Sequence, residues 1–495
     1  MTNRREFLKI GSSMMLAGVA GGAAAAPEPS PAKWTQSYDV VIIGAGGAGL
    51  SAACEAAKQG LKAIVIEKEP IIGGSSTLCG GKFAVAGTDE QKAKNINDTA
   101  KKFFDDMMKT GQNVNNPELV KVLVEESSYQ YKFITKELKV LPKEITAASG
   151  MSEPRGHAFK PAEVLKAMAD YAKSKGQSIV LNMKAERLTW DDKKKTISGV
   201  KCTRNGKTLF IEARKGVVLA SGGFCRAPEV IKKYVPAMAK AEVIAGLGTT
   251  GDGLKMAMAY GADVADMSYI KATYGFKPKA STISEMAQVY YGGAVMVNKA
   301  GKRFVNESIS YKLLGDAALN QQDGASYLVF DEAIRVRQMA HRSQDRALFS
   351  GIDEGKKLDY VFSGKSVEEA AKKAGLPAEV VAATVKKYNE DIKATGKDSV
   401  FGRETLTSGF GKPVLIENGP FYVMPATAVL IATYCGVCIN PKAQVIDVFG
   451  DVIKGLYAAG EITGGVHGAA YMTGTAWGKA MAFGGRAVKS IAKGE

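Results

Sequence analysis

The chain has 495 residues, of which 46% are hydrophobic and 23% are charged, and its formal net charge at neutral pH is +16. A chain of this length can bury more than one hydrophobic core, so we expect at least two domains. The lysines are scattered and lack the interleaved aromatic residues of a nucleic-acid-binding module, which excludes that class and favours a solvated basic surface. No long apolar run follows residue 26, which argues against a stable membrane anchor.

Residues 1–26 resemble a twin-arginine export signal. Arg4 and Arg5 precede a mildly apolar segment, Ile10 to Ala20, and a run of alanines at 23–26. The apolar segment is short and rich in Gly, Ser and Ala, which favours a cleavable signal over a transmembrane anchor. We therefore expect a periplasmic mature protein; a disordered basic tail is the alternative.

The next segment predicts a dinucleotide-binding turn. A strand at 38–43 runs into Gly44, Gly46 and Gly49, which open a helix. The first glycine makes the turn, the second lets the backbone approach a pyrophosphate, and the third lets the helix pack on the strand. Glu67 ends the following strand, where its carboxylate can accept hydrogen bonds from ribose hydroxyls. A glycine-rich turn that binds no nucleotide is the alternative.

The pattern along the rest of the chain predicts an α/β fold with two domains. A helix at 162–175, a strand at 178–183, a hairpin at 196–213 and a strand at 216–220 continue the alternation, which then gives way to mixed content and an amphipathic helix at 377–395. Strand and glycine-rich segments return from 433. We expect a discontinuous Rossmann-like domain at 34–267 and 433–495, with an inserted α+β capping domain at 268–432.

The six cysteines predict no metal site. Cys435 and Cys438 have the spacing of a haem-attachment pair, but no histidine follows, and no second pair completes a zinc or iron–sulfur set. Any haem must then belong to another protein.

Several motifs occur in the order of one known superfamily. They are the Gly44 loop, Gly73-Gly74-Ser75-Ser76, Ala220-Ser221-Gly222-Gly223, Thr250-Gly251-Asp252-Gly253, Arg303-Phe304-Val305-Asn306-Glu307 and the segment 455–468. The chain resembles the fumarate reductase flavoproteins and 3-oxosteroid 1-dehydrogenases. The resemblance implies noncovalent FAD, a mobile cap, and hydride transfer between flavin N5 and a carbon of an activated double bond. The cofactor-binding residues that it implies are Gly44, Gly46, Ala48, Gly49, Glu67, Lys68, Gly74, Ser75, Ser76, Gly80, Gly81, Ala185, Ser221, Gly222, Asp252, Glu461, His467, Thr475 and Ala476.

The chain departs from the fumarate reductases at the residues that grip the substrate. Tyr311 stands where those enzymes have the arginine that delivers the proton, and Ala432 and Tyr471 replace a histidine and an arginine that hold carboxylate. Thr273 or Tyr274 falls on a further histidine, and the proton-relay pair falls near Ala287 and Tyr290. A dianion costs several kcal/mol to desolvate without such partners, so we reject fumarate as the substrate.

Tyrosines take these places and predict an aromatic pocket that carries hydroxyl groups. The candidates are Tyr274, Tyr290 or Tyr291, Tyr311, Tyr434 and Tyr471. By resemblance to the steroid enzymes, Tyr311 is the acid or base and Tyr471 holds the ketone, with Tyr434 as a third catalytic candidate; core aromatics with one polar tip are the alternative. The steroid-enzyme likeness is incomplete, because Thr475 replaces a glycine and residues 141–155 lack the second catalytic tyrosine.

Three histidines and two arginines complete the candidates. His157 and His467 match family positions near the flavin, where a positioning role is favoured over proton transfer. His341, near Arg342 and Arg346, has no family match; the arginines could bind a substrate carboxylate, or they could lie on a solvated helix face.

We therefore expect a periplasmic FAD-dependent reductase of an activated C=C bond in an enone or an aromatic α,β-unsaturated acceptor. It would serve anaerobic respiration and draw electrons from a separate cytochrome c, whose acidic surface the basic chain could attract. A 3-oxosteroid-type dehydrogenase is the second hypothesis. A flavoprotein that carries electrons or senses a ligand without turnover is the third.

Overall fold

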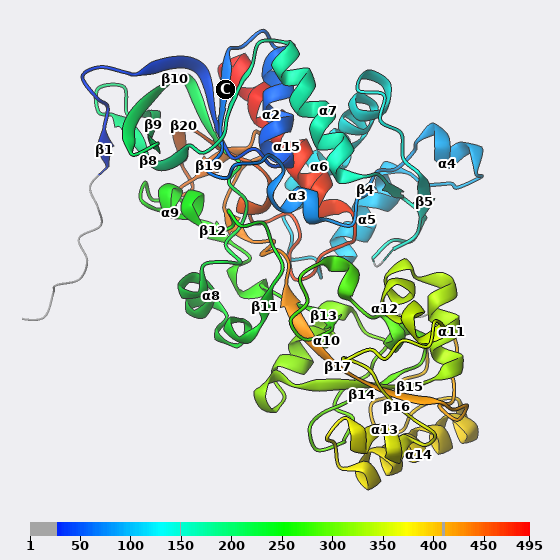
Figure 1. Cartoon of the computed structure of the whole chain (residues 1–495). Helices are drawn as coiled ribbons and strands as arrows, with labels where there is room; N and C mark the ends of the chain where they lie inside the picture. Colours follow the sequence, from blue (N-terminus) through cyan, green and yellow to red (C-terminus); the bar gives the residue numbers. More distant parts are fainter. Residues whose placement is uncertain (1–26, 149, 408–410) are drawn as a thin grey trace, which may run out of the picture.

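The computed structural model describes residues 27–148, 150–407 and 411–495, so the predicted export signal lies outside the described residues. Figure 1 shows an upper body built from both ends of this part of the chain and a lower body built from its middle. The long strand β17 (Phe421–Leu430) runs from the lower body toward the upper one. This arrangement is a mixed α/β fold, as the sequence predicts.

A nine-stranded sheet forms the centre of the upper body. Its parallel part runs in the order β20–β10–β2–β3–β7, and β9, β8 and β1 continue it beyond β10. The last four residues of β2 and all of β3 are apolar and buried, as expected for parallel strands covered on both faces. The strands are β1 (Glu28–Pro29), β2 (Gln36–Ile43), β3 (Ala63–Ile66), β7 (Ser178–Val180), β8 (Lys184–Asp191), β9 (Thr196–Arg204), β10 (Lys207–Leu219), β19 (Gln444–Ile446) and β20 (Val452–Ala458).

Two strands differ from the sequence-based expectation. The expected strands at 208–213 and 216–220 form the single strand β10, which pairs parallel with β2 along both halves. β10 also pairs antiparallel with β9 in its first half and parallel with β20 in its second. An irregularity in register between Ala213 and Gly216 separates the two halves. Strand β7 ends at Val180 rather than 183, because Asn182 adopts a left-handed backbone with φ of +53°.

Helices cover this sheet, and small residues bring two of them into contact. A Cβ at Gly484 of α15 would lie 2.2 Å from the carbonyl oxygen of Ala48 in α2, so the two backbones touch there. The helices of the upper body are α2 (Gly47–Lys58), α3 (Gly74–Leu78), α4 (Asp89–Ala93), α5 (Ala100–Thr110), α6 (Pro117–Lys132), α7 (Pro161–Ser174), α8 (Pro228–Tyr234), α9 (Asp252–Met258) and α15 (Thr475–Lys493). Smaller sheets pair β4 (Lys82–Ala84), β6 (Gly156–Ala158) and β5 (Glu144–Thr146), and β12 (Val264–Ala265) with β18 (Gly436–Val437).

The lower body is built on a six-stranded, mostly antiparallel sheet around β17. One of its strands, β11, precedes residue 268, where the inserted domain was predicted to begin. The predicted amphipathic helix is confirmed as α14. The elements are β11 (Glu242–Val243), β13 (Thr273–Phe276), β14 (Val295–Val297), β15 (Ser326–Asp331), β16 (Phe362–Gly364), α10 (Tyr311–Leu319), α11 (Glu332–His341), α12 (Ser343–Asp353), α13 (Val367–Lys373) and α14 (Ala378–Thr395).

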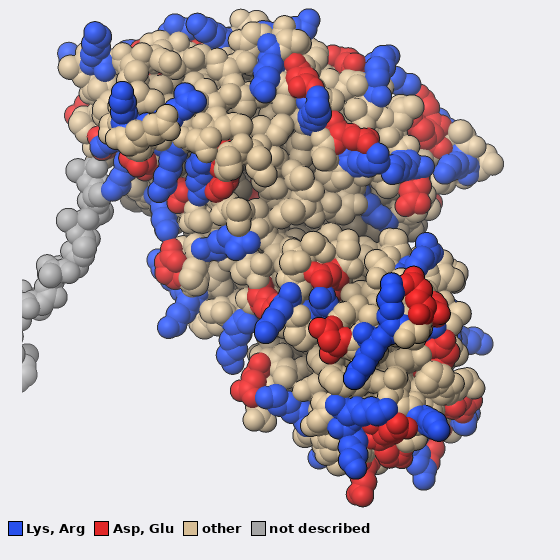
Figure 2. Space-filling view, in the orientation of Figure 1, with Lys and Arg blue, Asp and Glu red and all other residues tan. Residues whose placement is uncertain are grey.

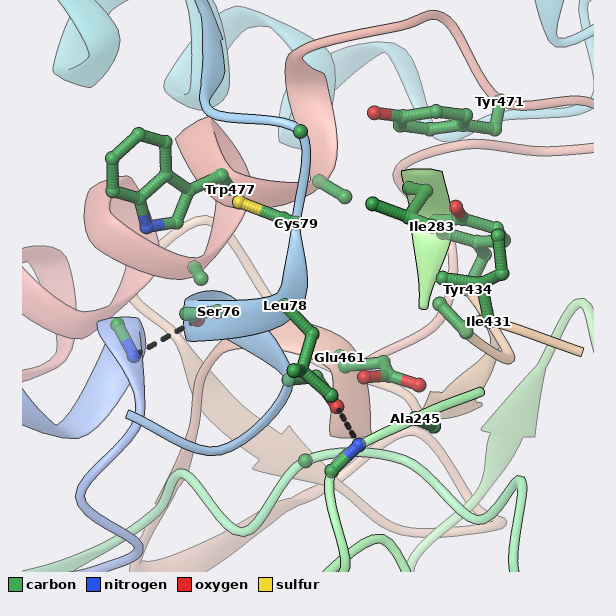
Figure 3. Close-up of a pocket in the computed structure, with 18 of the residues that line it drawn as sticks. Ser76, Leu78, Cys79, Ala245, Ile283, Ile431, Tyr434, Glu461, Tyr471 and Trp477 are labelled. Atoms are coloured by element: carbon green, nitrogen blue, oxygen red, sulfur yellow. Dashed lines mark hydrogen bonds between the residues drawn. The ribbon is translucent and has the colours of Figure 1, made fainter. Parts of the chain in front are cut away.

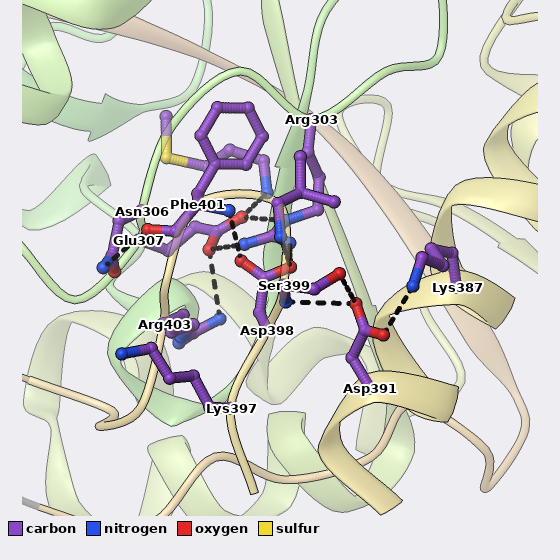
Figure 4. Close-up of polar contacts among 12 residues, drawn as sticks. Arg303, Asn306, Glu307, Lys387, Asp391, Lys397, Asp398, Ser399, Phe401 and Arg403 are labelled. Carbon is purple, nitrogen blue, oxygen red and sulfur yellow. Dashed lines mark hydrogen bonds and ion pairs between the residues drawn. The ribbon is translucent and has the colours of Figure 1, made fainter. Parts of the chain in front are cut away.

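A buried ion network holds the loop that leads into α10 (Figure 4). Arg303 pairs with Glu307 at 2.7 Å and with Asp398 at 2.6 Å, and Arg403 lies 3.5 Å from Glu307. All four side chains are at most 4% exposed. Because each charge has a partner, the network can be buried, and it fixes the segment that presents Tyr311.

The surface carries charges of both signs. On the face in Figure 2, lysines and arginines are spread over both bodies and are mixed with acidic side chains. None of the helices in the described part of the chain combines the length and apolar character that crossing a bilayer requires.

Candidate active site

A cavity of about 2120 Å³ lies between the two bodies. The glycine loops of the upper body line one part of it, and segments of the lower body that include Thr273, Tyr291 and Tyr311 line another. In Figure 3, Ser76 and Trp477 lie at one end of the pocket and Tyr434 and Tyr471 at the other. The volume exceeds the roughly 300–1,000 Å³ of a site for one drug-sized ligand, so it can hold a large cofactor and a substrate.

A different steric reason accounts for each of the three glycines in the first turn. Gly44 has φ of +109°, and a Cβ there would lie 2.4 Å from the carbonyl oxygen of Ala220. A Cβ at Gly49 would lie 1.8 Å from the carbonyl oxygen of Gly44, which only a glycine permits. Gly46 faces the cavity, and a Cβ there would meet no protein atom closer than 3.6 Å. Protein packing therefore explains the first and third glycines, and the second leaves room for a ligand.

Charged side chains are held around this loop. Glu67 accepts hydrogen bonds from the backbone N–H groups of Ala45 at 2.8 Å and Glu69 at 2.9 Å. Lys68 pairs with Asp252 at 2.8 Å. Burial opposes ionisation of Asp252, but the Lys68 ammonium outweighs it and holds the pKa of that carboxyl below its usual value. The Asp252 carboxylate is thus ionised at neutral pH, and hydrogen bonds and the ion pair fix both acidic side chains beside the loop.

Most of the predicted cofactor residues line the cavity. One of them is Glu461, whose Oε1 accepts a hydrogen bond from the Thr433 N–H at 2.9 Å. Burial raises the pKa of the Glu461 carboxyl. Three predicted residues do not line it: Gly49 packs against the turn, while His467 and Thr475 lie behind the wall. The predicted residues that do line it are Gly44, Gly46, Ala48, Glu67, Lys68, Gly74, Ser75, Ser76, Gly80, Gly81, Ala185, Ser221, Gly222, Asp252, Glu461 and Ala476.

The three predicted catalytic tyrosines meet in one part of the cavity. The rings of Tyr434 and Tyr471 stack with centroids 4.6 Å apart, and the edge of His467 contacts both. The hydroxyl of Tyr311 lies 3.4 Å from Thr473 Oγ1. Burial raises the pKa of all three tyrosines, so each is protonated at neutral pH. They can therefore donate hydrogen bonds or protons to a ligand.

Two of these tyrosines have constrained geometry. Tyr434 adopts a left-handed backbone with φ of +58°. This conformation costs a residue other than glycine about 1–3 kcal/mol, and such strained residues are concentrated at functional sites. The hydroxyl of Tyr471 accepts a hydrogen bond from the N–H of Gly474 at 2.8 Å. That bond uses an oxygen lone pair, so the hydroxyl hydrogen of Tyr471 remains available for another acceptor.

Two other tyrosines do not reach the cavity, contrary to the aromatic-pocket prediction. Tyr274 and Tyr290 are fully buried in the core of the lower body. The Tyr274 hydroxyl bonds to Ser326 Oγ at 2.9 Å, and the Tyr290 hydroxyl donates to the Tyr274 carbonyl at 3.4 Å. Tyr291 is the tyrosine of this segment that lines the cavity.

Two of the candidate histidines, His157 and His467, are buried and held by neighbouring groups. His157 contacts Thr88 Oγ1 and the Arg155 carbonyl, each at 2.9 Å, away from the cavity wall. Burial lowers the pKa of both His157 and His467, so both are neutral at pH 7. Through its ring contacts, His467 supports the stacked tyrosines.

The two candidate arginines of the lower body differ. His341 and Arg342 line the mouth of the cavity. Arg346 does not line it, and its guanidinium donates to the carbonyls of Met339 at 3.0 Å and Ala340 at 3.3 Å. Arg346 therefore caps the last turn of α11, and Arg342 is the arginine of this pair that lines the cavity.

Comparison with known proteins decides the family. A family profile described as FAD binding domain matches residues 39–476. The chain belongs to this FAD-binding family. It is 35% identical to a fumarate reductase (cytochrome) of Shewanella frigidimarina over 86% of this chain and 72% of that protein. It is 30% identical to a urocanate reductase of Eggerthella lenta over 87% of this chain and 71% of that protein.

A solved structure extends the likeness to steroid enzymes. The 3-ketosteroid-Δ4-(5α)-dehydrogenase of Rhodococcus jostii RHA1, in complex with 4-androstene-3,17-dione, superposes with a TM-score of 0.76 and 26% identity, covering 94% of this chain and 99% of that one. This flavoprotein is an FAD-dependent oxidoreductase that acts on carbon–carbon double bonds, in the superfamily of the fumarate reductases and ketosteroid dehydrogenases.

The cavity of the flavoprotein fits FAD. Ser221 Oγ and Trp477 Nε1 line it and are buried without a hydrogen-bond partner among the described residues, so a bound group must satisfy them. Gly46 leaves open space where the fingerprint places a pyrophosphate. The Glu67 carboxylate lies at the end of β3, where it can accept hydrogen bonds from ribose hydroxyls.

Sequence reasoning missed Lys312, which follows Tyr311 in α10. Its side chain is 2% exposed, and its Nζ lies 4.9 Å from the centre of the Tyr434 ring. The available signal was a lysine between the candidate tyrosine and the apolar residues Leu313 and Leu314.

Proposed function

We propose that this flavoprotein is a reductase of an activated C=C bond in an enone or an aromatic α,β-unsaturated acceptor, and that fumarate is not its substrate. The observation that carries the proposal is the cluster of Tyr311, Tyr434 and Tyr471 on one wall of the cavity. These side chains offer aromatic surface and hydroxyl donors, which suit a conjugated carbonyl compound. The resemblance to the fumarate reductases implies cationic side chains at the positions of Tyr311 and Tyr471, which this chain lacks.

The residues of the chain divide the chemistry between them. FAD, held along the glycine loops, would supply the hydride chemistry for the β-carbon of the acceptor. Tyr311 donates its phenolic proton to the α-carbon, since its raised pKa keeps it protonated at neutral pH. Tyr471 donates its free hydroxyl hydrogen to the carbonyl oxygen and stabilises the negative charge that develops there. Tyr434 orients Tyr471 by stacking on it.

The electron donor and the cellular location belong to the same proposal. The twin-arginine motif at Arg4 and Arg5 favours export to the periplasm. The relative from Shewanella frigidimarina is named a fumarate reductase (cytochrome), whereas the cysteines of this chain lack a haem-attachment histidine. A separate periplasmic cytochrome c is therefore the donor that we propose.

The test is anaerobic reoxidation. The purified protein is reduced chemically and mixed with fumarate, urocanate, cinnamate, simple enones or 3-oxosteroids while flavin absorbance is followed. Rapid reoxidation by an aromatic or uncharged acceptor supports the proposal. Rapid reoxidation by fumarate contradicts the substrate assignment, and persistence of reduced flavin with every acceptor contradicts the reductase itself.

A dehydrogenase of 3-oxosteroids or related ketones is the second candidate. The segment Asn306-Glu307-Ser308-Ile309-Ser310-Tyr311 and the free hydroxyl hydrogen of Tyr471 favour it, as does the likeness to the Rhodococcus enzyme. Bleaching of the oxidised flavin on addition of a saturated 3-oxosteroid distinguishes this direction from the first.

A further inference from the structure

The hydroxyl of Tyr311 contacts a threonine that comes from the other body. The Tyr311 oxygen lies 3.4 Å from Thr473 Oγ1, and this hydroxyl makes no other hydrogen bond with the described residues. Tyr311 is the first residue of α10 in the lower body, whereas Thr473 lies just before α15 in the upper body. Both side chains are half-buried and line the cavity. The contact therefore joins the two bodies at the cavity wall.

The backbone on both sides of Thr473 is fixed by its own body. The carbonyl of Gly474 accepts a hydrogen bond from the N–H of Ala84 in β4 at 3.1 Å. Met472 is fully buried, and its carbonyl accepts from Thr475 Oγ1 at 2.7 Å. The Thr473 hydroxyl is thus held in place independently of Tyr311. A donor that is already positioned can stabilise a new charge without the cost of being ordered first.

The contact between the two hydroxyls should strengthen during proton transfer. At 3.4 Å it is a weak hydrogen bond, because a good O–H···O distance is about 2.5–3.0 Å. When Tyr311 acts as the acid, its O–H bond breaks as the bond between hydrogen and the α-carbon forms, and the electron pair stays on the phenolate oxygen. Hydrogen bonds to a charged oxygen are shorter and stronger. Thr473 has one hydroxyl hydrogen to donate to it.

The lysine next to Tyr311 directs its hydrogen bonds elsewhere. The ammonium group of Lys312 lies 5.9 Å from the centre of the Tyr311 ring. Its Nζ donates to Thr273 Oγ1 at 2.7 Å and to the Lys271 carbonyl at 3.3 Å. Among the described residues, Thr473 is therefore the hydrogen-bond donor that a phenolate at Tyr311 would find.

We propose that Thr473 is a positioning residue for the proton transfer, and that it donates its hydroxyl hydrogen to the Tyr311 oxygen as that oxygen gives its proton to the α-carbon. This deepens the proposed function and rests on it. Because the bond is weak before the transfer and strong after it, Thr473 lowers the barrier without tightening the binding of the acceptor. Water from the mouth of the cavity returns the proton to the phenolate after the product has left.

The decisive experiment is a double-mutant cycle on the single-turnover reoxidation of the reduced holoenzyme by the best acceptor. Thr473→Val keeps the shape of the side chain but removes the hydroxyl. It should lower the limiting rate about tenfold and leave the half-saturating acceptor concentration unchanged, because the lost bond is one to a charged group. Thr473→Ser keeps a hydroxyl and should restore most of the rate. In the Tyr311→Phe background, Thr473→Val should have no further effect.

Two results of this cycle would overturn the proposal. One is a Thr473→Val rate within twofold of the wild type. The other is an equal slowing by Thr473→Val in the wild-type and Tyr311→Phe backgrounds, because Thr473 would then act through another group.

Thr384 provides the matched control for the loss of a threonine hydroxyl. It is half-buried like Thr473 and donates to the Gly301 carbonyl at 2.8 Å, but it does not line the cavity. Thr384→Val should therefore be reoxidised at the wild-type rate. If it is as slow as Thr473→Val, the effect is a general one of folding and the proposal is wrong.

A titration of Tyr311 separates this inference from the proposed function. A fluorinated tyrosine, whose phenol ionises at lower pH, replaces Tyr311, and its fluorine NMR signal is followed against pH in the oxidised holoenzyme. Burial raises the pKa of Tyr311 and the hydrogen bond with Thr473 lowers it, so Thr473→Val should raise the midpoint by about one pH unit. The other titratable groups around this phenol are the same in both proteins; they are Tyr290, Tyr291, Lys312, Tyr434 and Tyr471.

The titration is decisive whether or not the enzyme turns over. An unchanged midpoint would overturn the role of Thr473. If no acceptor reoxidises the flavin, the proposed reductase fails, whereas a raised midpoint in Thr473→Val would still show that Thr473 stabilises the Tyr311 phenolate.

Discussion

Replacement of Tyr311 by phenylalanine isolates the proton donor of the proposed reaction. The variant removes one oxygen atom and leaves the ring that packs in the cavity wall. The hydroxyl that is lost lies 3.4 Å from Thr473 Oγ1, longer than the roughly 2.5–3.0 Å of a good O–H···O bond. The cost to folding stability should therefore be below about 1 kcal/mol.

The effect on the reaction should be much larger. A positioned general acid contributes about 10²–10⁴-fold to a rate, which corresponds to roughly 3–5 kcal/mol in the barrier. Burial raises the pKa of Tyr311, so the wild type should not lose its proton donor between pH 7 and pH 9. Stopped-flow reoxidation of the reduced flavin by the best acceptor, in a single turnover, measures this step directly.

Tyr274 provides the control for this variant. Tyr274→Phe removes a hydroxyl that bonds to Ser326 in the core, so it should cost stability without slowing reoxidation. A Tyr311→Phe rate within twofold of the wild type, with FAD retained, would refute the assignment of Tyr311 as the acid.

Three further substitutions test the cofactor loop and the buried ion network of the lower body. Gly49→Ala places a Cβ 1.8 Å from the Gly44 oxygen, and we expect a loss of about 3 kcal/mol in unfolding free energy, measured by denaturant titration, together with poor FAD retention. Lys68→Met leaves Asp252 unpaired beside the cofactor loop and should weaken FAD binding about tenfold, a loss of roughly 1.4 kcal/mol, measured by fluorescence of released FAD. In the wild type, the pair contributes at neutral pH. Because the pKa of Asp252 is lowered, this contribution is lost only as the pH falls below the usual range of an aspartate. Asp398→Asn breaks the buried ion pair with Arg303 at 2.6 Å and should destabilise the protein by about 3–5 kcal/mol, measured as a lower denaturant midpoint. An unchanged midpoint would mean that the ion network does not stabilise the lower body.

The cofactor part of the site was readable from the sequence because its determinants are local. The turn at Gly44 and Gly49 depends on the φ angle and close contacts of residues only five apart, and Glu67 follows at the end of the next strand. A strand, a glycine turn and a helix therefore predict the phosphate-binding loop wherever they occur in this order.

The lower body was less predictable, because its side-chain directions are set by distant partners. Tyr290 and Tyr291 are adjacent, yet one is buried in the core and the other lines the cavity. Arg342 and Arg346 lie one helical turn apart, and only Arg342 of the two lines the cavity, because the Arg346 guanidinium caps the last turn of α11. Neither difference has a signal in residue type or spacing.

The sequence by itself determined the cofactor class and the mixed α/β plan, and it predicted that tyrosines stand in the place of charged substrate partners. Only the tertiary structure decided which tyrosines meet, because Tyr311 and Tyr471 are brought together by the packing of two bodies across 160 residues of chain. It also decided that Lys312 is buried against Thr273, with no ion pair to any of the described residues. Burial and charge balance depend on what long-range packing removes from water, and no local pattern in the sequence encodes them.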